Sequence, residues 1–170
     1  MKTIDAIFAR RSIRKYQEKP VESEKIELLL KAAMAAPSAR NSKPWEFVVV
    51  TDPSMMDKIR GVMMFGKFNA PMAIVVCGNL SLIKRLLVSQ FWVQDCSAAT
   101  ENILIAAVSL GLGTVWLGVH PIFNFTKRIS KVLQLPEHIK PLNVIYVGYP
   151  AQDKPARTQY DPEKVHWETF

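Results

Sequence analysis

Residues 91–118 of the chain read FWVQDCSAATENILIAAVSLGLGTVWLG. The part from Phe91 to Leu110 predicts the longest helix of the protein, with Gly111 as its C-terminal cap. Apolar side chains cover nearly the whole circumference of this helix, a pattern typical of a helix that is buried on all sides. Because a single chain of 170 residues can hardly enclose such a helix, we expect it to lie at a subunit interface.

The segments on either side predict short helices mixed with short strands. Amphipathic periodicity and caps predict helices at Thr3–Ala9, Ser23–Ala36, Pro53–Gly61 and Phe125–Leu133. Apolar, β-branched runs predict strands at Phe47–Val50, Ala73–Cys77, Thr114–Val119 and Asn143–Gly148. The strands are few and short, so a mixed α+β sheet is expected rather than a doubly wound parallel one. We expect one domain over residues 1–150 and a polar, proline-bearing C-terminal arm over residues 151–170.

The composition is that of an ordinary globular protein, with 49% hydrophobic and 22% charged residues. Cys77 and Cys96 lie in separate apolar stretches, and we expect two buried, reduced thiols rather than a disulfide or a zinc site. The sequence shows neither a secretory signal after Met1 nor an apolar run of about 18 residues. It therefore predicts a cytoplasmic protein without membrane attachment.

Basic residues outnumber acidic ones, and the formal net charge is +7. Such an excess can serve nucleic acid, a membrane surface or a small anionic ligand. Arg10, Arg11, Arg14 and Lys15 lie close together, whereas the other cations are scattered among acids. A local cluster favours a phosphate pocket over a long polyanion track, and the chain has no helix-turn-helix signature. We therefore expect no nucleic-acid partner.

The first candidate site is formed by Arg10, Arg11, Ser12 and Arg14. Planar guanidinium groups match phosphate oxygens in pairs, so two or three of them with a hydroxyl can neutralise a terminal phosphate. The alternative interpretation is a solvated basic patch. The histidines are too dispersed for a metal site, and neither a Ser-His-Asp order nor paired carboxylates indicate a catalytic side chain.

The other candidates are a loop and a glycine-containing strand. Residues 37–41 read PSARN, a loop of small residues in which backbone amides can approach a ligand and Asn41 can both donate and accept. The alternative is a plain connector between a helix and a strand. Residues 111–118 read GLGTVWLG, which lacks the spacing and the strand-to-helix order of a dinucleotide-binding fold. Gly118 inside a strand indicates a close backbone approach, as by a flat ligand.

Four segments in this order resemble the nitroreductase family of flavoenzymes. They are RRSIRKY (10–16), AAPSARNSKPWEFVVV (35–50), GLGTVWLG (111–118) and VGYP (147–150). The resemblance implies a mixed, mostly antiparallel sheet flanked by helices. It also implies a homodimer in which the long helix lies at the interface and the C-terminal arm is exchanged with the partner.

The resemblance also implies which residues contact FMN. One group of residues binds the phosphate and ribityl chain, a loop of the partner subunit contacts the flavin, and one strand runs along the edge of the flavin ring. The first group is Arg10, Arg11, Ser12, Arg14 and the late Arg157; the loop supplies Pro37, Ser38, Ala39 and Asn41; the strand supplies Leu117 and Gly118. Lys67 corresponds to a basic contact with the pyrimidine edge.

The activity implied by the resemblance is hydride transfer from NADH or NADPH, through flavin N5, to a nitroaromatic, quinone or flavin acceptor. In such an enzyme the flavin carries the chemistry, and the protein supplies binding, orientation and electrostatics. The alternatives are a related flavoenzyme that dehalogenates aromatics or cleaves flavin, and a non-catalytic dimer that binds polyanions. Many relatives carry a helical insertion where residues 78–90 are short here, which leaves the substrate class open.

Overall fold

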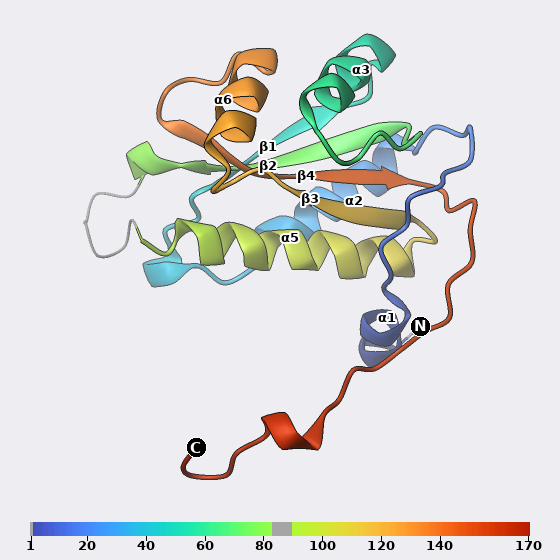
Figure 1. The fold of residues 1–170 in the computed structure, drawn as a ribbon, viewed down its shortest axis with the longest axis vertical. Helices are drawn as coiled ribbons and strands as arrows, with labels where there is room; N and C mark the ends of the chain where they lie inside the picture. Colours follow the sequence, from blue (N-terminus) through green and yellow to red (C-terminus); the bar gives the residue numbers. More distant parts are fainter. Residues whose placement is uncertain (1, 83–89) are drawn as a thin grey trace.

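The computed structural model describes residues 2–82 and 90–170 (Figure 1). The α-helices are α1 (Thr3–Ala9), α2 (Ser23–Met34), α3 (Pro53–Val62), α5 (Trp92–Ser109) and α6 (Phe123–Val132). The strands are β1 (Trp45–Val50), β2 (Met72–Asn79), β3 (Gly113–Gly118) and β4 (Ile139–Gly148). Among the described helices none is long and apolar enough to cross a membrane. The short segment 78–90 lies largely outside the described residues, because 83–89 are not among them.

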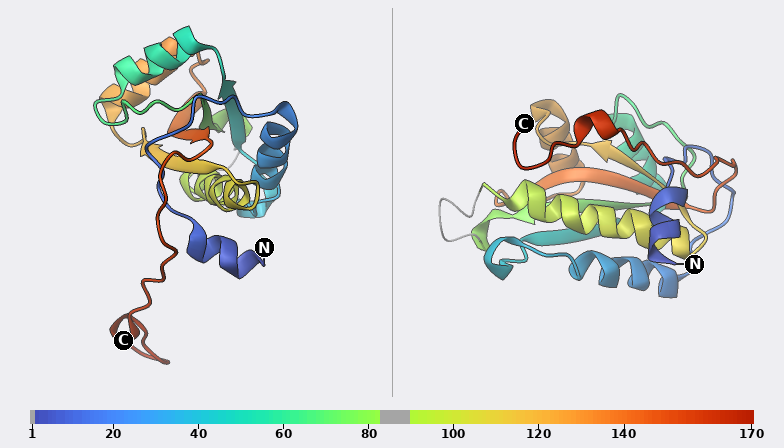
Figure 2. Two further views of the ribbon diagram at one scale, coloured as in Figure 1. Left: turned by 90° about the vertical axis from the view of Figure 1, so that its right-hand side faces the viewer. Right: turned by 90° about the horizontal axis from the view of Figure 1, so that it is seen from below.

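The four strands form one sheet in the order β1-β2-β4-β3, and every neighbouring pair is antiparallel. Helices α2 and α5 cover one face of this sheet, and α3 and α6 cover the other (Figures 1 and 2). This arrangement confirms the α+β prediction. Helices cover both faces of the two central strands, β2 and β4, so these strands carry mainly apolar residues on both faces. Every residue of β2 is buried.

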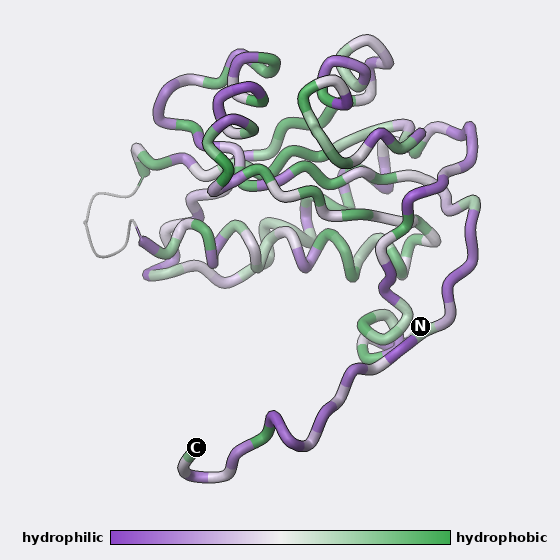
Figure 3. The backbone as a smooth tube through the Cα atoms, in the orientation of Figure 1, coloured by the Kyte–Doolittle hydropathy of each residue, from purple (hydrophilic) through white to green (hydrophobic). Residues whose placement is uncertain are grey.

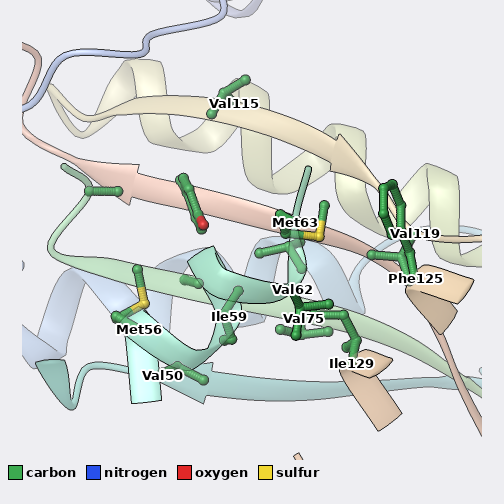
Figure 4. Close-up of a cluster of buried hydrophobic side chains, with 14 of the residues drawn as sticks. Val50, Met56, Ile59, Val62, Met63, Val75, Val115, Val119, Phe125 and Ile129 are labelled. Atoms are coloured by element: carbon green, nitrogen blue, oxygen red, sulfur yellow. The ribbon is translucent and has the colours of Figure 1, made fainter. Parts of the chain in front are cut away.

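Two apolar layers hold the helices to the sheet. Between the sheet and the pair α3 and α6, the core includes Val50, Met56, Ile59, Val75 and Ile129 (Figure 4). On the opposite face, α2 and α5 contribute a second cluster, which contains Leu29, Ala33, Cys96, Ile103 and Ile145. Figure 3 shows the strands and α5 as mainly hydrophobic and the C-terminal arm as mainly hydrophilic. Cys77 and Cys96 are both buried and free, as the sequence predicted.

Element ends follow local chemistry. Asp52 caps α3 by accepting a hydrogen bond from the Met55 backbone N–H, with Pro53 at the first helical position. Gly111 follows α5 with a φ of 71°, the left-handed conformation of a helix C-terminus. Strand β4 begins at Ile139, four residues before the predicted start, and it accommodates Pro141 at a shift of register opposite Val76 and Cys77. Proline has no N–H group to donate to the neighbouring strand, so it is tolerated where the regular pairing of β2 and β4 is interrupted.

Several apolar side chains stay exposed within one chain. Ile4, Ile7 and Phe8 of α1 are exposed, and α5 leaves a partly open face that includes Ile105. The arm extends away from the domain, and its Trp167 side chain is 80% exposed (Figures 1 and 2). Exposed apolar groups of this kind mark interaction surfaces. The subunit interface at α5 and the exchange of the arm remain predictions.

Candidate functional site

Two segments that are far apart in the sequence lie side by side. Residues 8–17 run along residues 149–157, the root of the C-terminal arm. The Arg157 backbone N–H donates to the Phe8 carbonyl at 3.0 Å, and the Ala151 N–H donates to the Lys15 carbonyl at 2.9 Å. These bonds bring the arginine cluster of the N-terminal segment next to the cations of the arm.

The result is a concentration of positive charge. The Lys154 ammonium donates to the Ser12 carbonyl at 2.7 Å. Partial burial lowers the pKa of Lys154, and the nearby charges of Arg14, Arg11 and Arg157 lower it further. Over residues 2–82 and 90–170, no ion pair joins these four cations to a carboxylate. The cluster is therefore suited to an anion with several oxygens.

The four predicted residues of the N-terminal segment differ in what they contact. The Arg10 Nε atom lies 3.4 Å from the Glu101 Oε1 atom on α5, so Arg10 already has a carboxylate partner. The Arg11 guanidinium donates to the Pro155 carbonyl and fastens the arm root. Arg14 is exposed, and its guanidinium carbon lies 6.0 Å from the centre of the Phe68 ring. Of the three arginines, Arg14 is the one most available to a ligand.

Lys154 is a candidate that the sequence interpretation missed. The stretch KPAR at residues 154–157 contained the signal, since it places a second cation three residues before Arg157. What the sequence could not show is the bond from Lys154 to Ser12, which depends on the pairing of segments more than 100 residues apart.

Strand β3 forms one edge of the sheet, and its outer edge is only partly covered. The Ile13 N–H donates to the Thr114 carbonyl at 2.8 Å from the outer side, while the Val119 N–H donates to Leu142 at 3.0 Å on the inner side. Because backbone groups alternate sides along a strand, the N–H and C=O of Gly118 point outward like those of Thr114. Gly118 is exposed, and among the described residues a Cβ atom placed on it would meet nothing within 4 Å.

The segment before β2 lies against the same strand. Gly66, at a φ of 112°, packs so closely that an added Cβ would lie 2.6 Å from a methyl carbon of Leu117. Its neighbour Phe65 is 73% exposed beside this edge, a feature that the sequence interpretation left without a role. Lys67 lies on this segment and lines a cavity of about 690 Å³ with Gln17 and Phe68, the residue whose ring lies against Arg14. The structure therefore places Lys67 beside the segment that carries Arg14, and its contact with the pyrimidine edge remains a prediction.

The loop with Pro37, Ser38, Ala39 and Asn41 is held at the first turn of α5. The Ala39 N–H donates to the Asp95 carboxylate at 2.9 Å, and the Ser38 hydroxyl accepts from the Lys43 N–H at 2.9 Å. Asn41 has a φ of 54°, which is uncommon for a residue with a side chain. Such a conformation persists where the surroundings hold it, and it is frequent at ligand sites.

This loop and the arginine cluster lie at opposite ends of α5 (Figure 1). The helix has 18 residues and so is about 27 Å long. The loop lies at its N-terminal turn, whereas Ser12 pairs with Thr114, just beyond its C-terminal cap. One chain therefore brings the cation cluster together with β3, but it does not bring either to the loop.

Comparison with known proteins identifies relatives across the whole chain. The model of the nitroreductase family matches residues 7–66 and 64–149. A protein of Methanothermobacter thermautotrophicus with the provisional name NADH dehydrogenase/NAD(P)H nitroreductase is 46% identical over 172 residues, which cover 100% of this chain and 88% of the relative. An FMN-dependent nitroreductase structure from Clostridium difficile R20291 superposes with a TM-score of 0.89 at 33% identity, covering 98% and 99% of the two chains. An iodotyrosine deiodinase of Haliscomenobacter hydrossis is 27% identical over 84% of this chain and 77% of its own length.

Proposed function

This chain belongs to the nitroreductase family, and on that premise we propose that it is a homodimeric, FMN-dependent oxidoreductase. It takes hydride from NADH or NADPH and passes it to a nitroaromatic, quinone or flavin-type acceptor. The observation that carries this proposal is the placement of an unneutralised cation cluster and an open backbone edge on one strand. An anionic tail and a flat ring require these two features at a fixed separation.

The two features lie along one strand, which supports the proposal. From Thr114, where the cluster lies, to Gly118 the strand advances four residues, or about 13 Å. Arg14, Lys154 and Arg157 would hold the phosphate at one end, while the ribityl chain would follow the strand. At the other end Gly118 has no side chain, so the ring can approach the backbone closely.

FMN, when bound, supplies an acceptor and donor of hydride at its N5 atom. The chain's own residues bind and orient the reactants around that atom. The outward N–H of Gly118 is the donor that would face N5, and Leu117 beside Gly66 would support the ring edge. Lys67 is the candidate for a positive charge near the pyrimidine edge, where it would favour the reduced anion; it directly follows Gly66, which packs against Leu117.

The separation of the arginine cluster and the Ser38 loop, at opposite ends of α5, supports the proposed dimer. Two copies of α5 packed antiparallel about a twofold axis would set the Ser38 loop of each subunit against the arginine cluster of its partner. The partner would then contribute Pro37, Ser38, Ala39 and Asn41. Such packing would also cover the exposed side chains of α1 and α5. The arm over residues 151–170, with Trp167 exposed, would pack on the partner's domain 1–150.

A second candidate activity is reductive dehalogenation, which the similarity to an iodotyrosine deiodinase favours. The two activities share the cofactor and differ in the acceptor. Anaerobic turnover with nitrofurazone, menadione and an iodotyrosine separates them, and we expect the nitro compound and the quinone to be reduced faster.

The decisive experiment combines a visible spectrum of the purified protein with mass spectrometry of the released chromophore. We expect a flavin spectrum, FMN as the chromophore and bleaching by NADH or NADPH without oxygen. Light scattering after size-exclusion chromatography should give the mass of a dimer. A monomer that stays colourless after incubation with FMN would contradict the proposal.

A further inference from the structure

The chain turns directly from the end of β3 into helix α6. The N–H groups of Val119 and His120 both donate to the Leu142 carbonyl, which fixes the path of the chain after Gly118. Helix α6 then starts at Phe123, five residues beyond Gly118 and so at most about 18 Å from it. It lies over the end of the sheet at which β3 finishes (Figure 1).

The solvent side of α6 is basic and has an aromatic group at its start. Phe123 is 75% exposed, and Lys127 and Lys131 follow it at intervals of four residues, which places all three on one side of the helix. Arg128 is exposed on the next position around the helix. In the described part of the chain, no carboxylate forms an ion pair with these three cations.

A small cavity of about 240 Å³ opens on this side of α6. Phe123, Thr126, Lys127 and Ser130 line it from the helix, and Lys140 lines it from β4. One acid, Glu137, also lies on the wall. The Thr126 hydroxyl donates to the Ile122 carbonyl, which leaves Ser130 as the hydroxyl donor. An aromatic face, a hydroxyl and two ammonium groups are the chemistry that recognises a phosphorylated nucleoside: stacking for a base, and charge-assisted hydrogen bonds for phosphate.

We infer that this α6 surface, comprising Phe123, Lys127, Lys131 and Lys140, binds the adenosine-phosphate half of the nicotinamide dinucleotide that donates hydride. This inference rests on the proposed function, because the nicotinamide half must reach the flavin beside Gly118. The α6 surface begins at that end of β3, whereas the larger cavity with Lys67 also includes Gln17, close to the arginine cluster. A few cations around a small cavity suit a dinucleotide better than a long polyanion.

The test compares two donors with the same reactive ring. NADPH carries the adenosine-phosphate half, and reduced nicotinamide mononucleotide lacks it. The variant combines Lys127→Glu with Lys131→Glu, and the matched control is Lys58→Glu, which reverses an exposed charge on α3. Rapid-mixing measurements of flavin bleaching give the apparent Kd for each donor. The visible spectrum gives FMN occupancy, and reoxidation by menadione reports on the flavin itself.

We expect the double variant to weaken NADPH binding about fivefold or more at low salt, with the difference shrinking as salt is added. FMN occupancy, reoxidation by menadione and the Kd for the mononucleotide should match the wild-type protein and the control. An NADPH Kd within twofold of wild type, or an equal loss of affinity for the mononucleotide, would overturn this inference and leave the proposed function standing. If NADPH binding is unchanged but an acidic ferredoxin no longer reduces the flavin of the variant, the α6 surface would be assigned to an electron-carrier protein. This result would also overturn the inference. Wild-type protein that does not bind FMN would overturn the proposed function as well.

Discussion

Arg14→Ala separates a role in binding from a role in folding. The Arg14 side chain is exposed, forms no ion pair among the described residues and has its one aromatic contact with Phe68, 6.0 Å from the ring centre. An exposed cation–π contact contributes about 0.5–1 kcal/mol. The backbone bond from Ile13 to Thr114 does not depend on the side chain. We therefore expect the free energy of unfolding of the apoprotein to fall by no more than about 1 kcal/mol.

The expected effect on cofactor binding is larger. A hydrogen bond between guanidinium and phosphate contributes about 1.5–3 kcal/mol, so its loss should weaken the Kd for FMN roughly 10- to 150-fold. Quenching of flavin fluorescence during titration of the apoprotein measures the Kd, and urea unfolding measures stability. Lys15→Ala, next in the chain and exposed, is the control and should stay within about threefold of wild type. Equal losses of stability and FMN binding in Arg14→Ala would refute the assignment and make Arg14 a structural residue.

Three further outcomes are expected. Gly118→Ala should leave the free energy of unfolding of the apoprotein, measured with urea, within about 0.5 kcal/mol of wild type, because the added Cβ meets nothing within 4 Å among the described residues. The same change should weaken FMN retention, and full retention would show that the flavin ring lies elsewhere. A hydrogen bond from Tyr149 is the main reason that the pKa of Glu22 is lowered to about 2. The Glu22 carboxylate therefore stabilises the fold above its ordinary pKa of 4.5, and this contribution disappears as the pH falls toward 2. Tyr149→Phe should raise the pKa of Glu22, which an NMR titration measures. Burial raises the pKa of Cys77 and of Cys96 to about 12, so iodoacetamide at pH 8 should label neither thiol until urea is added.

Helix and strand positions were predictable where a local chemical signal marks the end. Thr3–Ala9 was predicted with the observed bounds, and Asp52 with Pro53 correctly marked the start of α3. Helix α2 ends at Met34 instead of Ala36, because a residue before proline is disfavoured in the helical conformation. The early start of β4 could not be read from the sequence, since Pro141 argues against a strand and only the irregular pairing with β2 accommodates it.

The sequence indicated candidate site residues, but it could not show what each of them contacts. Sequence clustering indicated the arginines, but it could not distinguish Arg10, which pairs with Glu101, from Arg14, which is exposed. Nor could it find the bond of Lys154 to Ser12, because the two are joined only when the arm root lies along the N-terminal segment. The open environment of Gly118 likewise depends on β3 being an edge strand.

The distance between the two ends of α5 has a genetic consequence. If each pocket takes its cation cluster from one subunit and its Ser38 loop from the other, as proposed, Arg14→Ala and Asn41→Ala damage different halves of it. Hybrid dimers refolded from the two variants would then have one pocket with both intact halves and one pocket with both damaged halves. Two variants that each bind FMN weakly should therefore recover tight binding in a mixture, which could not happen if every contact came from a single polypeptide.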